Sequence, residues 1–144
     1  QAFNTIIPPQ QRVVVVLSVA QAGLESNWGQ SRFAQLGYNF YGIIESDPTE
    51  PHIKALESDV IVKKYGRKCE SVANYITMLN THSYFEEYRE VRLKQFIAGE
   101  MDIEALANTL HAYAIDPFYV YKVKDTVKYL YKNYPNIFHI TTGA

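Results

Sequence analysis

The chain has 144 residues, and its 14 basic and 15 acidic residues give a formal net charge of −1. Hydrophobic residues make up 47% and charged residues 20%, which is typical of a globular protein and excludes a disordered, collagen-like or coiled-coil chain. The balanced charge provides no overall field that would attract nucleic acid or an anionic membrane. The length fits a single domain, which we expect to span residues 1–144.

The number of cysteines, the spacing of the histidines and the length of the apolar runs exclude further kinds of site. Cys69 is the single cysteine, so an intramolecular disulfide and a cysteine-based zinc site are excluded. The histidines have no i, i+4 pair of the kind that binds metal on a helix, and we expect neither metal nor cofactor. They are His52, His82, His111 and His139. The longest apolar run, residues 13–17, is far shorter than the roughly 20 residues that span a bilayer.

The chain begins at Gln1 with no visible signal peptide, so we expect a fragment or a processed form. Residues 1–10 read as an irregular arm that ends in prolines suited to the start of a helix. Apolar residues at helical spacing then predict a helix over about residues 11–27. They are Val13, Leu17, Ala20 and Leu24. A second, short helix is expected at about residues 30–36, ended by Gly37.

The next segment, about residues 39–65, has a different character. It contains the turn-forming pairs Asp47-Pro48 and Glu50-Pro51, and it ends in a β-branched run at residues 60–62. These features predict a hairpin with strands at about residues 40–44 and 59–64, joined by a long loop.

The rest of the chain reads as helical. Helices are predicted at about residues 69–80, 85–98 and 102–112, with Gly99 as a stop signal. Asp116 and Pro117 fit an N-cap and the first position of a last helix that runs to about Tyr131. The sequence therefore predicts an α+β fold, with a mainly helical lobe and one small inserted β-hairpin lobe.

Glu25 is the first candidate for chemistry. It lies near the C-terminal end of an otherwise apolar helix, one turn before Trp28. The negative end of a helix dipole and an apolar wall such as an indole both disfavour a charged carboxyl, and both raise its pKa. A raised pKa suits a general acid near neutral pH. The alternative is a solvated glutamate on the polar face of the helix.

The residues around Glu25 resemble a known family. Residues 20–31 read Ala-Gln-Ala-Gly-Leu-Glu-Ser-Asn-Trp-Gly-Gln-Ser, and residues 39–43 read Asn-Phe-Tyr-Gly-Ile. Both stretches resemble the glucosaminidase family of peptidoglycan hydrolases (glycoside hydrolase family 73), which includes flagellar muramidase-like domains and Bax-like proteins. Gly23 departs from the family pattern, which usually has Ala. The resemblance continues at residues 64–79 and 111–119.

This resemblance implies a lysozyme-like fold with a groove between the helical lobe and the β-lobe. It implies an endo-β-N-acetylglucosaminidase that cleaves the β-1,4 bond after N-acetylglucosamine in the glycan strands of bacterial peptidoglycan. Glu25 would be the catalytic acid. An autolysin-like, secreted, periplasmic or cell-wall-associated protein would be expected. Two alternatives are a lytic transglycosylase, which gives anhydro products, and a non-catalytic glycan-binding domain.

A second catalytic carboxylate would be expected on the β-lobe, because many glycosidases use two. The candidates are Glu45, Asp47, Glu50, Glu57 and Asp59. We prefer Glu57, followed by Asp59, because both lie nearest the second predicted strand. Alternatively, the N-acetyl group of the substrate acts as the nucleophile, and no β-lobe carboxylate is needed in that role.

Five further residues are expected at the site. Tyr113 matches the family tyrosine beside the acid and is the third catalytic candidate, with a core tyrosine as its alternative. The substrate-binding candidates are Trp28, Asn39, Tyr41 and Tyr119. Each has a structural alternative, namely a core anchor for Trp28, a turn cap for Asn39 and helix packing for Tyr119. Tyr41 alternates with Phe40, so that one of the two faces the groove and the other the core.

Overall fold

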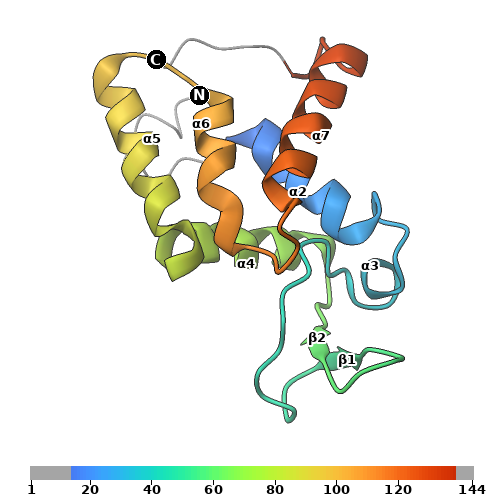
Figure 1. The fold of residues 1–144 in the computed structure, drawn as a ribbon. Coiled ribbons are helices and arrows are strands. Elements are labelled where there is room, and N and C mark those ends of the chain that lie inside the picture. Colours follow the sequence, from blue (N-terminus) through green and yellow to red (C-terminus); the bar gives the residue numbers. More distant parts are fainter. Residues whose placement is uncertain (1–13, 139–144) are drawn as a thin grey trace. The chain divides into compact units, whose positions relative to one another are not determined.

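The computed structural model describes residues 14–138, so the arm expected at residues 1–10 and His139 lie outside the described residues. The helices and strands follow one another along the chain as coloured in Figure 1. They are α2 (Val15–Ser26), α3 (Arg32–Gly37), β1 (His52–Lys54), β2 (Ile61–Lys63), α4 (Lys68–Thr81), η2 (Ser83–Phe85), α5 (Glu86–Ala98), α6 (Ile103–Asn108), η3 (Thr109–Ala112) and α7 (Tyr119–Asn133). The chain is mainly helical with a small hairpin, as predicted.

The described residues group into two compact units. One contains residues 14–20 and 77–138, and the other contains residues 21–76. The division falls within α2 and within α4.

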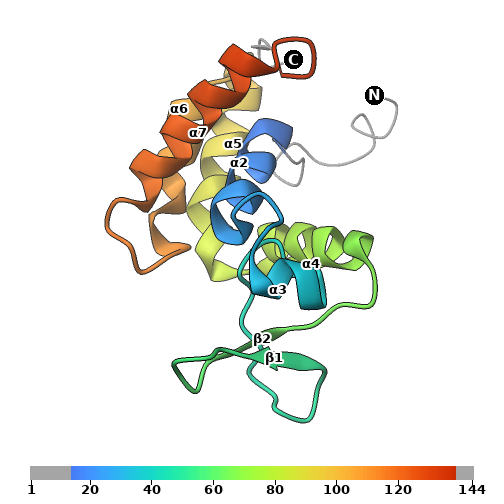
Figure 2. The same cartoon turned by 90° about the vertical axis from the view of Figure 1, so that its right-hand side faces the viewer.

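In the unit of residues 77–138, α6 and α7 lie side by side (Figures 1 and 2). The buried faces of α6 and α7 carry mainly apolar residues. Helix α5 packs against α6. The large buried apolar side chains of this unit are Leu79, Phe85, Tyr88, Leu106, Leu110, Tyr119, Val123, Val127 and Leu130. Their helical spacing explains why these helices could be predicted.

In the unit of residues 21–76, β1 and β2 form an antiparallel pair with Ile53 opposite Val62. Both of these side chains are buried. The predicted first strand at residues 40–44 is wrong, because the strand that precedes β2 is β1. The sequence gives little signal for β1, since Ile53 is its single apolar residue between two polar ones.

Residues 43–45 nevertheless pair with β2 on its other side. The Lys63 N–H donates to the Ile43 carbonyl, and the Glu45 N–H donates to the Ile61 carbonyl, both at 3.0 Å. Part of the predicted pairing is therefore present, although it amounts to an isolated bridge and not to a strand.

Gly99 acts as the predicted helix stop, and Asp102 provides a cap that was not predicted. Gly99 ends α5 in the left-handed conformation, with φ of 71°. The Oδ1 atom of Asp102 accepts from the Ala105 N–H at 3.1 Å and caps the start of α6. These two groups fix the turn between α5 and α6.

Two other signals are displaced. Gly37 is the last residue of α3, and Tyr38 takes the left-handed cap position, with φ of 52°. Asp116 does not cap α7, which begins at Tyr119. Its Oδ1 atom instead accepts from the Phe118 N–H at 2.9 Å, in a turn that precedes the helix.

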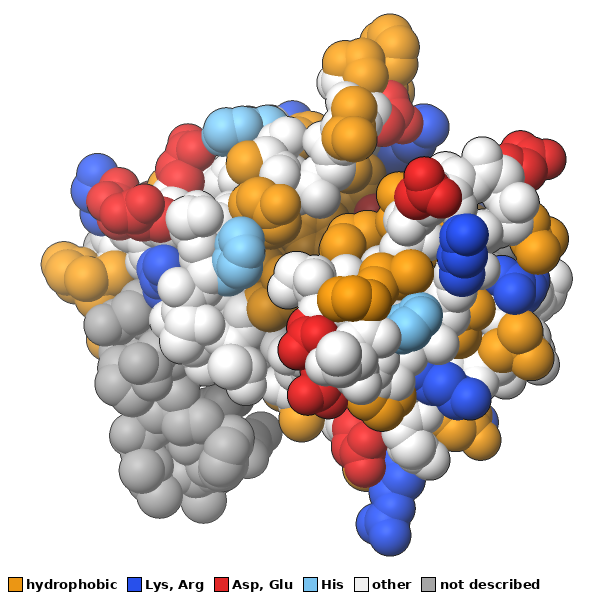
Figure 3. Space-filling model, turned by 90° about the horizontal axis from the view of Figure 1, so that it is seen from below, with side chains coloured by type: hydrophobic (Ala, Val, Ile, Leu, Met, Phe, Trp, Pro, Cys, Tyr) orange, Lys and Arg blue, Asp and Glu red, His pale blue; other side chains and the backbone are white. Residues whose placement is uncertain are grey.

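Every helix among residues 14–138 is too short or too polar to span a bilayer. Within the same residues, no three His, Cys, Asp or Glu side chains come together as a group that could hold a metal ion. On the face drawn in Figure 3, Lys and Arg side chains are interspersed with acidic and uncharged ones.

Candidate active site

Glu25 is the next-to-last residue of α2, and its half-buried carboxyl lies against the backbone of Gly42. A Cβ atom at position 42 would lie 2.7 Å from Oε2 of Glu25, closer than such atoms approach in proteins. Gly42 also has φ of 67°, which favours glycine. Position 42 therefore favours glycine, and its backbone forms one wall around the Glu25 carboxyl.

A left-handed turn follows the end of α2 and positions Trp28. Asn27, Trp28 and Gly29 have φ of 48°, 56° and 81°. The Trp28 N–H donates to the Gly23 carbonyl at 2.9 Å, and the Gly29 N–H donates to Oγ of Ser26 at 2.9 Å. A positive φ is rare for a bulky side chain, so it persists only where surrounding bonds impose it.

The indole of Trp28 packs on Gly23. A Cβ atom at position 23 would lie 2.7–2.8 Å from three atoms of the Trp28 ring. This contact explains why Gly occupies the position where the family pattern has Ala. Trp28 is still 50% exposed, so it both anchors the turn and presents ring surface to solvent.

Asn39 closes the loop that contains Gly42. Its Nδ2 atom donates to the carbonyls of Ile43 and Lys63, each at 2.9 Å, and its Oδ1 accepts from the Ile43 N–H at 3.1 Å. Asn39 is 1% exposed. Both amide hydrogens are used within the chain, so the structure favours the turn-capping alternative for Asn39 over substrate contact.

Helix α4 supports the same loop from a second direction. The Oγ atom of Ser71 accepts from the Phe40 N–H at 3.3 Å. The ring of Tyr41 stacks on that of Tyr75, with centroids 4.0 Å apart and planes at 17°. The Tyr75 hydroxyl in turn donates to Oε1 of the buried Gln21. Tyr41 is buried, so within the Phe40–Tyr41 pair it is Tyr41 that faces the core.

Glu45 is the buried carboxylate of the β region. Its Oε1 accepts from Nζ of Lys63 at 3.0 Å, and its Oε2 accepts from the Asp47 N–H at 3.2 Å. The Asp47 N–H and the Lys63 ammonium lower the pKa of Glu45. Glu45 and Lys63 line a polar cavity of about 350 Å³ together with Glu50, Pro51, Lys64, Tyr65 and Asn74.

The other predicted carboxylates of this region are exposed. Oδ1 of Asp47 accepts from the N–H and hydroxyl of Thr49, which lowers the pKa of Asp47. Asp59 lies 3.7 Å from Nζ of Lys54. Glu57 lies in the loop between β1 and β2, and its catalytic role stays a prediction.

We expect Glu45→Gln to destabilise the fold most near pH 7 and least in acid. The pKa of Glu45 in the folded chain lies below its ordinary value of 4.5. The charged form therefore contributes stability above about pH 4.5, and this contribution is lost as pH falls through the folded pKa. The unfolding temperatures of wild type and variant, measured from about pH 7 to about pH 3, should converge as pH falls. A constant difference would contradict this account. Lys63→Met should show the same convergence.

Tyr113 and Tyr119 stack on each other in the unit of residues 77–138, with centroids 5.8 Å apart and planes at 17°. The ring of buried Phe85 lies 5.7 Å from that of Tyr113. Tyr119 is 4% exposed, so the structure favours packing for it. Tyr113 keeps part of its surface accessible.

A model of the glucosaminidase family, described as mannosyl-glycoprotein endo-beta-N-acetylglucosaminidase, matches residues 9–132. The chain belongs to the glucosaminidase family. A crystal structure of a peptidoglycan hydrolase mutant from Sphingomonas sp. A1 is similar, with a TM-score of 0.57 and 22% identity, covering 88% of this chain and 91% of that one. This similarity confirms the predicted lysozyme-like, mainly helical fold with a hairpin. No curated protein matches the chain.

The matched family motifs include residues that hold the candidate site in place and whose roles were not predicted from the sequence. Gly42 was part of the matched motif, but its contact with Glu25 is visible only in three dimensions. Ser71 and Tyr75 likewise belong to a matched stretch, and they hold the loop that carries Gly42. The sequence signal for Ser71 and Tyr75 is their spacing of about one helical turn. This spacing places a small polar side chain and an aromatic side chain on the same face of a helix.

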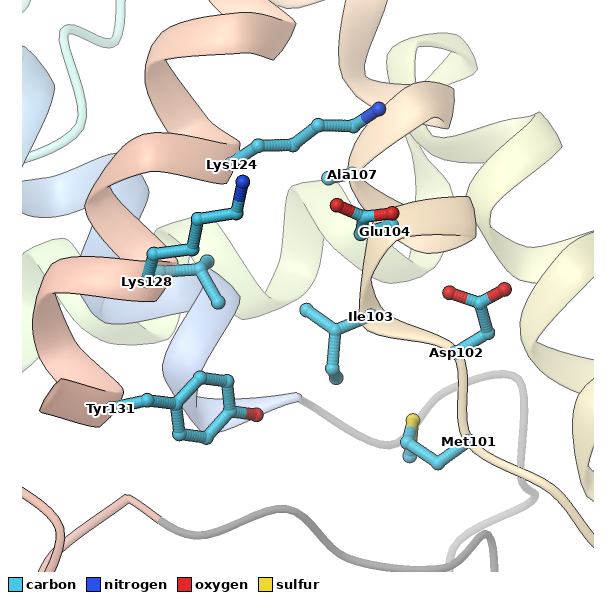
Figure 4. Close-up of a pocket in the computed structure, with 9 residues that line it drawn as sticks. Met101, Asp102, Ile103, Glu104, Ala107, Lys124, Lys128 and Tyr131 are labelled. Atoms are coloured by element: carbon cyan, nitrogen blue, oxygen red, sulfur yellow. The ribbon is translucent and has the colours of Figure 1, made fainter.

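Figure 4 shows a pocket between α6 and α7 that lies apart from the predicted site residues. Its volume is about 260 Å³. Ile103, Val127 and Tyr131 give it a mainly apolar wall, and Glu104 and Lys124 add charged side chains to its lining. It contains none of the predicted site residues, and its lining offers no nucleophile beside a base.

Proposed function

We propose that the chain is a peptidoglycan hydrolase, an endo-β-N-acetylglucosaminidase that cleaves the β-1,4 bond after N-acetylglucosamine in glycan strands. The observation that carries the proposal is the Glu25 carboxyl, half-buried at the end of α2 and walled by the backbone of Gly42. Family membership and a fold shared with a peptidoglycan hydrolase support the substrate class.

In this mechanism Glu25 is the general acid. It protonates the glycosidic oxygen while C1 of the sugar gains oxocarbenium character. The first step requires the protonated form of the Glu25 carboxyl. The exposed surface of Trp28 offers an apolar ring for the sugar to pack on.

Water then attacks C1, either directly or after the N-acetyl group of the substrate has attacked C1 and formed a cyclic intermediate that the water opens. Tyr113 would hydrogen-bond the N-acetyl group or direct the water. Glu57 is the proposed β-lobe carboxylate if a second one takes part, with Asp59 next. Substrate-assisted attack by the N-acetyl group needs neither as the nucleophile. No step in this mechanism calls for a cofactor.

The proposed setting follows from the substrate. Peptidoglycan lies outside the cytoplasmic membrane, so we place the protein in a secreted, periplasmic or cell-wall-associated location. We also propose that residues 1–144 form one catalytic domain, because the family match covers residues 9–132 and so includes parts of both compact units.

Digestion of purified peptidoglycan, followed by mass analysis of the products, tests the proposal. New reducing ends of N-acetylglucosamine are the expected result. Anhydro products, lighter by one water, would instead assign a lytic transglycosylase. Binding to glycan strands without any product from the folded protein would assign a glycan-binding domain.

A further inference from the structure

A row of aromatic rings runs from the core to the surface in the unit of residues 77–138. The row starts at buried Tyr119 and passes through Tyr113 to Tyr84 and His82. The Tyr113 and Tyr84 centroids lie 6.3 Å apart with planes at 65°, and those of Tyr84 and His82 lie 4.1 Å apart at 47°. Tyr84 is 41% exposed at the outer end. The row therefore extends the accessible surface of Tyr113 outward.

The outer end of the row is held in place by its own backbone. Nδ1 of His82 accepts from the Tyr84 N–H at 3.1 Å and caps the short helix η2. Nη1 of Arg89 donates to the carbonyls of Leu79 and His82 at 2.8 and 3.2 Å. These bonds tie the end of α4 to η2, so the ring of Tyr84 projects from a fixed base.

Tyr84 is not the residue of η2 that fills the core. The next residue, Phe85, is 0% exposed and supplies the aromatic core contact of η2. Tyr84, which is exposed, and His82, which is partly exposed, each combine a ring with a polar atom. Such groups suit a saccharide, whose C–H face packs on an aromatic ring while its hydroxyls hydrogen-bond to polar tips.

We propose that Tyr84 and His82 bind a second saccharide ring, next to the ring that Tyr113 contacts. This inference rests on the proposed function. The ligand class is a β-1,4-linked N-acetylhexosamine strand, and the added site makes the protein prefer longer strands over a disaccharide. Tyr84 and His82 take no part in the bond cleavage.

The test measures calorimetric binding of soluble β-1,4-linked N-acetylglucosamine oligomers, from disaccharide to hexasaccharide, to chains with Glu25→Gln to prevent turnover. Adding Tyr84→Ala should weaken hexasaccharide binding about 3- to 10-fold and leave disaccharide binding unchanged. Adding Tyr84→Phe should retain most of the affinity. Adding His82→Asn removes the ring but keeps a good capping group, and should also weaken hexasaccharide binding.

Tyr129→Ala is the matched control. Tyr129 is 49% exposed, and its ring meets that of Tyr134 at 6.3 Å and 68°, which is nearly the geometry of the Tyr84–Tyr113 pair. Hexasaccharide affinity should not change in this variant. Equal hexasaccharide affinity in Tyr84→Ala and Tyr129→Ala would overturn the inference. So would an equal loss for disaccharide and hexasaccharide, because Tyr84 would then act only through Tyr113. If no oligomer binds to the chain with Glu25→Gln alone, the proposed function fails as well.

Discussion

Glu25→Gln lowers the rate of glycan cleavage by at least ~100-fold, since general acid catalysis contributes roughly 10²–10⁴. Glutamine has nearly the same shape as glutamate, so it still fits against the backbone of Gly42, but its amide cannot deliver a proton to the leaving oxygen. The measurement is the initial rate of reducing-end release from purified peptidoglycan. The unfolding temperature of the same sample shows whether the variant is folded.

Glu57→Gln is the matched comparison for Glu25→Gln, because it makes the same chemical change on an exposed carboxylate of the same unit. A comparable loss would support Glu57 as the second catalytic group. An unchanged rate would favour attack by the N-acetyl group of the substrate. A folded Glu25→Gln variant that keeps more than about a tenth of the wild-type rate is incompatible with Glu25 as the general acid.

Gly42→Ala should also reduce cleavage by ~100-fold, the effect expected when a catalytic group is displaced by about 1 Å. The new methyl group would lie 2.7 Å from Oε2 of Glu25, so the carboxyl must move away. The end of a glutamate side chain moves at little cost in folding free energy. The main loss of stability should come from the positive φ at position 42, about 1–2 kcal/mol. The measurements are kcat and the free energy of unfolding.

Gly99→Ala is the control that separates the effect of Gly42→Ala on stability from its effect on activity. Gly99 has φ of 71°, close to the 67° of Gly42, but a Cβ atom at position 99 would meet nothing within 4 Å. Both variants should therefore lose similar stability, while only Gly42→Ala loses activity. Equal activity in the two variants would show that the contact between Gly42 and the Glu25 carboxyl has no catalytic importance.

The helices were predictable because their apolar residues repeat at the helical period. Val123, Val127 and Leu130 on α7 are all buried, as their spacing indicated. The hairpin was harder to predict, since β1 is three residues long and has one apolar residue between two polar ones. The start of α7 was misplaced because Asp116 binds the Phe118 N–H in a turn, which competes with capping.

In the candidate site, too, features set by neighbouring residues could be predicted, whereas features set by contacts between distant residues could not. Glu25 could be proposed from its position on a helix and its motif, which are local properties. The burial of Tyr41 and Asn39 could not, because it depends on contacts with Tyr75 and Lys63 far along the chain. The wall that Gly42 forms against Glu25 arises from the same long-range packing.

The left-handed turn after Glu25 lowers the stability of the fold but holds the backbone between Glu25 and Trp28 in one conformation. Most side chains pay roughly 1–2 kcal/mol in this conformation, which Trp28 adopts together with Asn27, a residue type that tolerates it better. Glycine at position 27 would relieve part of that cost in the folded state. It would also give the backbone between the acid and the indole more freedom to move. Selection for heat resistance alone is therefore expected to erode this turn, whereas selection for cleavage should retain it.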